Sequence, residues 1–207
     1  MLKKNQGSIR VVILFLLMAL LLLYFPINQN VKGGITPDLP LDAKIQLIPI
    51  WIIPYLLSIL WWIVAIIWAT AKMDFGRYLH FSVCLVLTIV VSYLIFLIFP
   101  TYVIRPTILG DDFLSQLVAY TYGNDQPYNA LPSGHAYTTL IISTFWFSWK
   151  PKQRYLWISI VIVVILSTLF TKQHYILDPA ASAVVVLITY RISAYLVRGF
   201  QTPPDTG

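Results

Sequence analysis

The stretch Leu79–Phe99, LHFSVCLVLTIVVSYLIFLIF, decides the fold, because it holds no Asp, Glu, Lys or Arg. A helix of about 17 to 25 mostly apolar residues crosses a bilayer core about 30 Å thick. The stretch is therefore predicted to span a membrane. The whole chain agrees: its mean hydropathy is +0.77, and only 11% of its 207 residues are charged, against about 25% in soluble domains.

Five further stretches are apolar enough to predict an all-α integral membrane protein with six transmembrane helices. The predicted spans are Ile9–Phe25, Leu47–Thr70, Leu79–Phe99, Ala136–Trp149, Tyr155–Thr171 and Pro179–Val197. They leave no room for a second soluble domain, so residues 1–207 are interpreted as a single membrane domain. The first apolar run is long and lacks a small-residue cleavage site, which favours a retained span over a signal peptide.

The basic residues predict the orientation of the chain. With the N-terminus inside, ten of the 14 Lys and Arg residues fall on the inner side, as the positive-inside rule requires. They are Lys3, Lys4, Arg10, Lys72, Arg77, Lys150, Lys152, Arg154, Arg191 and Arg198. Both termini are expected in the cytoplasm. Orientation accounts for the net charge of +6, so no nucleic-acid partner is expected.

The longest stretch outside the predicted spans runs from Pro100 to Pro132. Within it, residues 111–122, DDFLSQLVAYTY, place apolar side chains at helical spacing after an Asp pair that suits a helix start. We expect a short amphipathic helix in this outer loop, lying on the membrane surface between spans three and four. Two roles for it are open, a cap on the bundle and the border of a lipid access route.

Four ionisable residues fall at the outer ends of the predicted spans. They are Arg105, His135, His174 and Asp178. Because spans four and five form a hairpin, the two histidines return to the same side of the membrane. Ionisable groups at membrane depth are functional candidates by default.

The sequence NALPSGHAYT, residues 129–138, is typical of an anion site at a helix start. Ser133 is expected to be the N-cap of span four, where free N–H groups and the helix dipole attract an anion. Gly134 lacks a side chain, so an oxyanion can approach its backbone closely. His135 would then lie beside the anion and could donate a proton to a leaving oxygen near neutral pH.

The sequence TKQHYILDP, residues 171–179, supplies a second half-site. Asp178 is expected to cap span six and to bind one ring nitrogen of His174, which leaves the other nitrogen as a nucleophile. Arg105 and the helix-start amides would supply positive potential for phosphoryl oxygens. Two His and one Asp could also ligate a metal, but an Arg and an anion site suit a metal poorly. No metal and no cofactor are therefore expected.

In these segments the chain resembles the type 2 phosphatidic acid phosphatase superfamily, which is marked by K-x6-R-P, P-S-G-H and S-R-x5-H-x3-D. The residues that match these motifs are Arg105, Pro106, Pro132, Ser133, Gly134, His135, Ser167, His174 and Asp178. The resemblance covers about residues 98–182, the expected catalytic core. Six spans are also the usual layout of the family.

Two motif positions depart from the family pattern. Ile98 stands at the Lys position of the first motif and Thr168 at the Arg position of the third. Lys172 is a candidate substitute for phosphate binding, and an ordinary interfacial lysine is the alternative. The residues of the first and third motif segments are most similar to those of the branch of inositol phosphorylceramide and sphingomyelin synthases. These enzymes transfer a phospho-headgroup to a lipid alcohol.

The resemblance implies a metal-independent lipid phosphatase that works through a phosphohistidine at His174. Asp178 would orient His174, His135 would act as acid and base, and Arg105, Ser133 and Gly134 would hold the phosphoryl oxygens. Hydrolysis is preferred because water needs no dedicated pocket. Headgroup transfer to a lipid alcohol is the first alternative, and a non-catalytic lipid-binding membrane protein is the second. The partners expected are a membrane lipid phosphate and the bilayer, with the site on the non-cytoplasmic side.

Overall fold

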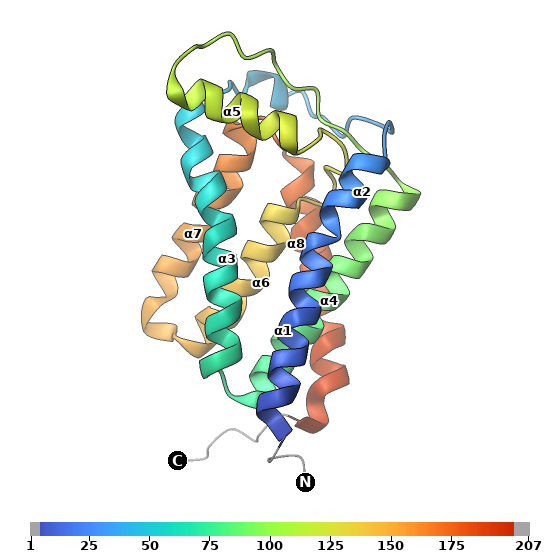
Figure 1. Ribbon diagram of the computed structural model, residues 1–207, viewed down its shortest axis with the longest axis vertical. Coiled ribbons are helices and arrows are strands. Elements are labelled where there is room, and N and C mark those ends of the chain that lie inside the picture. The colour runs from blue at the N-terminus through green and yellow to red at the C-terminus, as the bar shows by residue number, and fades with distance from the viewer. Residues whose placement is uncertain (1–4, 201–207) are drawn as a thin grey trace.

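The computed structural model describes residues 5–200, which form a bundle of long helices roughly parallel to the long axis of the molecule (Figure 1). The first four helices are α1 (Gln6–Leu22), α2 (Tyr24–Asn30), α3 (Ile52–Lys72) and α4 (Phe75–Ile98). The others are α5 (Phe113–Asn124), α6 (Gly134–Trp149), α7 (Arg154–Phe170) and α8 (Leu177–Val197). Short 3-10 turns occur at Asp42–Lys44, Pro49–Trp51, Pro151–Gln153 and Arg198–Phe200. Across residues 5–200 there is no strand beyond two isolated bridges, so the all-α class is confirmed.

Within residues 5–200, five helical segments are long and apolar enough to cross a membrane. They are Gln6–Asn30, Pro49–Lys72, Phe75–Ile98, Pro151–Phe170 and Leu177–Val197. The predicted span Ala136–Trp149 coincides with α6, which has 16 residues and is about 24 Å long at 1.5 Å per residue. That is shorter than a hydrocarbon core, so the structure gives five candidate spans by length and composition, and a sixth crossing stays a prediction.

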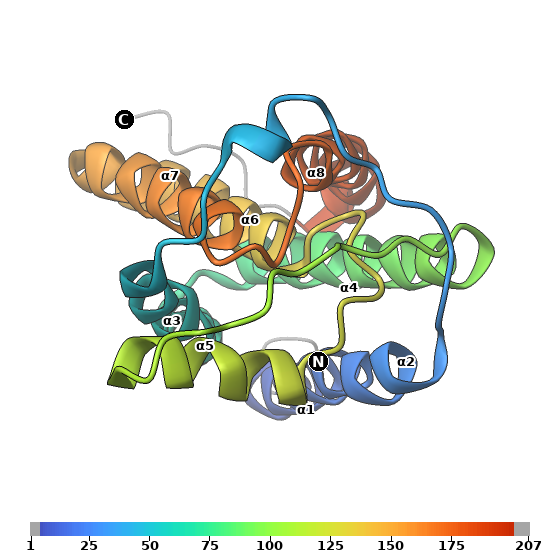
Figure 2. The ribbon, with the colours of Figure 1, turned by 90° about the horizontal axis from the view of Figure 1, so that it is seen from above.

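Helix α6 lies in the middle of the bundle, in contact with α3, α4, α7 and α8 (Figure 2). Most of its residues are buried, and Ile141, Phe145 and Trp146 join the main apolar core. Neighbouring helices therefore cover α6 on most sides. Its first turn, which carries His135, opens toward the end of the bundle that also holds α5.

The first turn of α1 and the last turn of α8 lie at the opposite end of the bundle from α5 (Figure 1). Arg10 ties α1 to the end of α3, because its guanidinium donates to Thr70 O at 2.8 Å and to Met73 O at 2.7 Å. These carbonyls follow the last helical hydrogen bonds and would otherwise be unsatisfied. Lys3 and Lys4, which the orientation argument uses, lie outside the described residues.

Helix α5 crosses the end of the bundle (Figure 1). It begins at Asp112, whose carboxylate accepts the backbone N–H groups of Leu114 at 3.0 Å and Ser115 at 3.2 Å. Its Val118 is buried against Ile52 and Tyr55 of α3. Phe113, at the start of α5, is 76% exposed, so one face of the helix packs on the bundle and large apolar groups remain outside. A position of α5 on the membrane surface stays a prediction.

Candidate functional site

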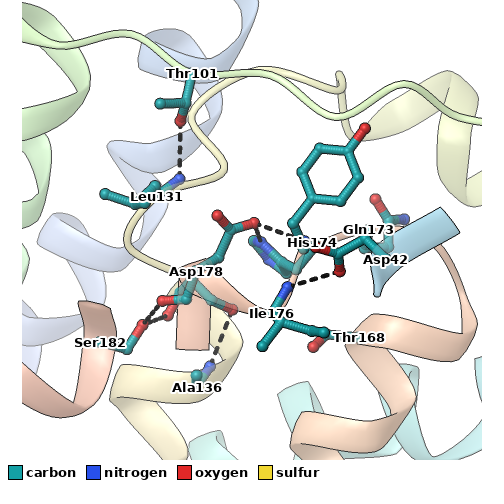
Figure 3. A network of polar contacts seen from close by, with 12 residues as sticks. Asp42, Thr101, Leu131, Ala136, Thr168, Gln173, His174, Ile176, Asp178 and Ser182 are labelled. Atoms are coloured by element: carbon teal, nitrogen blue, oxygen red, sulfur yellow. Dashed lines mark hydrogen bonds and ion pairs between the residues drawn. The ribbon is translucent and has the colours of Figure 1, made fainter. Parts of the chain in front are cut away.

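The pair His174 and Asp178 lies where α7 connects to α8 (Figure 3). His174 Nδ1 is 3.0 Å from Asp178 Oδ2, which also accepts the backbone N–H of Tyr175 at 2.9 Å. The Asp178 side chain is fully buried, and that of His174 is 10% exposed. A carboxylate can only accept, so Nδ1 carries the proton and Nε2 keeps its lone pair. The arrangement makes Nε2 a candidate nucleophile.

The backbone of this connection is fixed by a turn at the end of α7. Thr168 O accepts the N–H groups of Gln173 at 3.0 Å and His174 at 3.2 Å. Lys172 adopts a left-handed backbone, with φ of 52°. Helix α8 then begins at Leu177 without a side-chain cap, so the expectation that Asp178 caps it was wrong. The carboxylate of Asp178 instead faces back toward Tyr175 and His174.

Ser133 joins the two motif segments. Its Oγ accepts the N–H of Ala136 at 3.3 Å, so its predicted role as the N-cap of α6 is confirmed. Its own N–H donates to Asp178 O at 3.3 Å. Ser182 Oγ lies 3.0 Å from Ser133 O and 2.8 Å from Asp178 O. The start of α6 and the start of α8 are thus bonded to each other through backbone groups.

Gly134 is the first residue of α6. A Cβ built on it would meet Tyr137 Oη at 3.6 Å, an ordinary contact distance. Packing within the chain therefore does not demand glycine at this position. What glycine contributes here is open access to the backbone, as expected for an anion site.

His135 is held by aromatic rings. Its imidazole stacks on Tyr55, with ring centroids 4.0 Å apart and planes 22° apart, and lies 4.8 Å from Trp62. The ring centroids of His135 and His174 are 6.5 Å apart. Within residues 5–200, His135 Nε2 is buried and has no hydrogen-bond partner. The two histidines are close enough for one phosphoryl group to contact both rings.

Arg105 is anchored by the segment that ends α5. Its Nη1 donates to Asp125 O at 2.5 Å and to Tyr122 O at 3.4 Å, and its Nη2 donates to Gln126 O at 3.3 Å. Nη2 also donates to the side-chain oxygen of Gln173, the neighbour of His174. The guanidinium lies 4.6 Å from the centre of the Tyr122 ring. Arg105 therefore contacts the His174 loop. The sequence predicted that Arg105 lies at the same end of the bundle, but not which residues it contacts.

Tyr122 links α5 to the same loop. Its hydroxyl donates to Thr171 O at 2.7 Å. Burial raises the pKa of Tyr122 to about 12, against an opposing effect of the Arg105 charge. The phenol therefore keeps its proton across the physiological range and remains a donor.

Lys172 reaches the first outer loop. Its Nζ donates to Asp42 O at 2.9 Å, and the buried Asp42 carboxylate accepts Ile176 N at 2.9 Å through Oδ1 and Leu39 N at 2.8 Å through Oδ2 (Figure 3). The loop around Asp42 is thus fastened to the His174 loop. Phosphate binding by Lys172 stays a prediction beside this structural contact.

The two residues that depart from the motifs, Ile98 and Thr168, differ in exposure. Ile98, at the end of α4, is 80% exposed. Thr168 is fully buried, and its hydroxyl donates to Ile165 O at 2.7 Å. Neither side chain, as placed, is available to bind an anion at His174.

Sequence reasoning missed Tyr55, Asp125, Gln173 and Asp42 as parts of this site. Asp125 accepts the hydroxyl of Tyr24 at 2.7 Å and that of Tyr55 at 3.1 Å. None of the four residues is specified by a motif, and their partners lie far along the chain, so only proximity in space identifies them. In the described part of the chain, no three His, Cys, Asp or Glu side chains gather as a metal-binding group.

Comparison with known proteins gives one result. A family model described as the PAP2 superfamily matches residues 41–192. This range includes Asp42, all the motif residues and most of α8. No curated protein and no solved structure matches the chain.

Proposed function

The chain belongs to the PAP2 superfamily, whose members are typically phosphoric-ester hydrolases, and on that premise we propose that it is a membrane lipid phosphatase. The substrate would be a phosphomonoester or pyrophosphate of a membrane lipid. The observation that carries the proposal is the His174–Asp178 pair at 3.0 Å, with the ring of His135 6.5 Å from that of His174.

The first step forms a phosphohistidine. His174 Nε2 attacks phosphorus, and the bond from phosphorus to the leaving oxygen breaks with its electron pair going to oxygen. His135 donates a proton to that oxygen, so the lipid alcohol leaves neutral. Asp178 stabilises the positive charge that develops on His174, because its carboxylate is buried against Nδ1.

The second step returns the enzyme to its starting state. A water molecule gives a proton to the now neutral His135 and attacks phosphorus. The P–N bond then breaks, and His174 regains its lone pair as inorganic phosphate leaves. The proton balance closes because His135 ends protonated, as it began.

Positive charge and N–H groups would stabilise the phosphoryl oxygens in both steps. Arg105 supplies the charge, and the Gly134 amide, at the start of α6, supplies a donor aligned with the helix dipole. The Ser133 N–H is already bonded to Asp178 O, so Ser133 would contribute through its hydroxyl. Lys172 is a further candidate if its side chain leaves Asp42.

Headgroup transfer is the second candidate, favoured by Ile98 and Thr168 at the positions where the family motifs have Lys and Arg. In that reaction a lipid alcohol replaces water in the second step, and His135 takes its proton. The same His and Asp residues serve both reactions. A lipid product that forms only when an acceptor alcohol is added would favour transfer.

The proposed topology has six crossings, with α6 as a short central one. A helix enclosed by others does not need to match the full bilayer thickness, because its ends contact protein rather than lipid. With both termini cytoplasmic, the end of the bundle that holds His135 and His174 would face the non-cytoplasmic side.

The first experiment measures release of inorganic phosphate from a panel of lipid phosphates in detergent micelles with EDTA present. Wild type should release phosphate, and His174→Ala should lose activity by at least about 10³-fold, as nucleophile removal does elsewhere. His80→Ala is the matched control. His80 packs between Phe145 and Tyr190 at the other end of the bundle, so its loss should leave activity in place.

Two outcomes contradict the proposal. Release that survives in His174→Ala means that another group is the nucleophile. If folded wild type releases no phosphate from any substrate, hydrolysis is ruled out, and headgroup transfer is tested next with added acceptor lipids. Arg105→Ala separates an enzyme from a non-catalytic lipid-binding protein, because only an enzyme has turnover to lose.

A further inference from the structure

Several buried polar atoms without partners gather around the proposed site. Among residues 5–200, Arg105 Nε, His135 Nε2, Gln173 Nε2 and Asp178 Oδ1 are buried and make no hydrogen bond. A buried donor left unsatisfied is unfavourable, so native proteins rarely keep one without a reason. Gln173 falls at an unspecified position of the third family motif and has no role in the mechanism above.

The orientation of the Gln173 amide follows from chemistry. Arg105 Nη2 donates to it, and a guanidinium has no acceptor, so the amide oxygen must face Arg105. The NH2 group must therefore point away from Arg105. Gln173 is 3% exposed, and the described chain offers no acceptor to Nε2. Its two N–H bonds are left for something that the chain itself does not provide.

The place of Gln173 in the loop connects it to the reacting atoms. Its backbone N–H and that of His174 share one acceptor, Thr168 O, at 3.0 and 3.2 Å. Figure 3 shows Gln173 on the same connection as His174, between α7 and α8. Its partner Arg105 is the cation expected to bind phosphoryl oxygens. An acceptor held between Arg105 and His174 would thus lie within reach of the free NH2 group.

The motif departures explain why another donor is needed. Thr168 stands where the third motif has Arg, and its hydroxyl is already bonded within α7. Ile98 stands where the first motif has Lys, and it points out of the bundle at 80% exposure. Gln173 extends from the turn that Thr168 O fixes.

We propose that Gln173 is a substrate-binding residue, whose side-chain NH2 donates to an oxygen of the phosphoryl group while its oxygen holds Arg105 in place. The role rests on the proposed function for its substrate, a lipid phosphate. It adds to that function a neutral donor in a site that lacks two of the family's cations. Because Gln173 binds oxygens and moves no proton, it contributes equally for good and poor leaving groups.

The test measures binding of inorganic phosphate to the full-length protein in detergent. The dissociation constant comes from the rise of the thermal unfolding midpoint with phosphate concentration, which needs no turnover. Gln173→Leu removes both polar groups at similar size. Gln173→Glu keeps an oxygen for Arg105 but replaces the donor with a carboxylate. Gln116→Leu is the matched control, since Gln116 is exposed and bonds Asp111 O in the loop before α5.

Gln173→Leu should weaken phosphate binding by about 10- to 100-fold, the range for a hydrogen bond to a charged group. Gln173→Glu should weaken it at least as much while the ligand-free unfolding midpoint stays within a few degrees of wild type. Gln116→Leu should match wild type. In turnover assays, Gln173→Leu should lower kcat/KM by similar factors for a nitrophenyl and an alkyl phosphate.

Affinity within twofold of wild type in either Gln173 variant overturns the inference, as does wild type that binds no phosphate. The proposed function fails separately, if wild type binds phosphate but cleaves no lipid phosphate. In that event the loss of phosphate affinity in Gln173→Leu still supports the binding role. If Gln173→Leu is too unstable to measure, Gln173→Met, which is uncharged and of similar length, takes its place, because Gln173→Glu also adds a charge that repels phosphate.

Discussion

At the scale of single residues, Asp178 determines what His174 can do. Its Oδ2 holds both the His174 ring and the Tyr175 backbone, and the side chain is fully buried. An uncompensated charge would be unfavourable in such a place, so the contact with imidazole is part of what keeps the carboxylate there. Removal of the negative charge should therefore affect the reaction more than the fold.

Asp178→Asn tests this role. The amide oxygen can take the place of Oδ2 and still accept from Tyr175 and His174. The negative charge that stabilises the developing imidazolium is lost, however. We expect kcat to fall by on the order of 10²- to 10⁴-fold with little change in KM. Steady-state kinetics on a lipid phosphate measures both constants. A kcat within threefold of wild type would falsify the orienting role.

Tyr55 positions His135 by stacking rather than by a hydrogen bond. Tyr55→Phe keeps the ring and loses only the bond to Asp125, whereas Tyr55→Leu loses the stacked face. Aromatic pairs contribute about 0.5 to 1.5 kcal/mol, so Tyr55→Leu should lower kcat by about 2- to 10-fold on an alkyl phosphate. The effect should shrink for a nitrophenyl phosphate, whose leaving group needs no proton. Equal losses on both substrates would argue against positioning of an acid.

At the scale of elements, the site depends on loops fastened to helices. The loop that contains Asp42 and the loop that contains His174 are joined by two contacts, Lys172 Nζ to Asp42 O and Ile176 N to Asp42 Oδ1. The carbonyls at the end of α5 hold Arg105 in a similar way, because its guanidinium donates to Tyr122 O and Asp125 O.

Asp42→Ala should destabilise the protein and loosen the His174 loop. It leaves two partly buried backbone N–H groups, those of Leu39 and Ile176, without their acceptor. Water can replace part of the lost bonding, so the expected cost is at most about 1 to 3 kcal/mol for each group, seen as a lower midpoint of thermal unfolding, with a reduced kcat. Unchanged stability would mean that the two loops are not joined in solution.

Lys172→Met separates the two roles open for Lys172. If the contact with Asp42 is its function, the variant should lower the unfolding midpoint and leave the dissociation constant of phosphate within twofold. If Lys172 replaces a missing family cation, phosphate binding should weaken by 10-fold or more instead. Lys32→Met, a change in the outer loop away from these contacts, serves as the control.

At the scale of the whole molecule, the bundle has one end rich in basic residues and an opposite end that carries His135 and His174. Orientation can be tested by labelling cysteines introduced on either side of the membrane. The chain's single native cysteine, Cys84, serves as the unlabelled background. Cys84 is buried in α4 and should not react with a membrane-impermeant maleimide in intact cells. Leu109, in the loop before α5, is 91% exposed.

Leu109→Cys should be labelled in intact cells, whereas Lys152→Cys, in the turn between α6 and α7, should be labelled only after permeabilisation. These outcomes follow from the proposed non-cytoplasmic site and cytoplasmic basic turns. The reverse pattern would invert the topology. Labelling of both positions in intact cells would place α6 and α7 outside the bilayer.

Local properties of the sequence were enough to predict several features correctly. The all-α class, the positions of the long helices, the N-cap at Ser133 and the contact between His174 and Asp178 depend on neighbours within about four residues. Helix caps are harder to predict, because a side chain near a helix start can accept other N–H groups than those of the helix. Asp178 illustrates this, since it bonds Tyr175 and His174 rather than capping α8.

The sequence alone determined a membrane bundle with two histidines, an Asp and an Arg assigned to one end. Only the tertiary structure decided which groups surround them. The contacts of Arg105 with Gln173, and of Asp42 with Ile176, span 68 and 134 residues of chain. The physical reason is that periodicity and composition fix each helix separately. Such long-range contacts depend instead on how the helices pack together, which brings side chains from distant parts of the sequence next to one another.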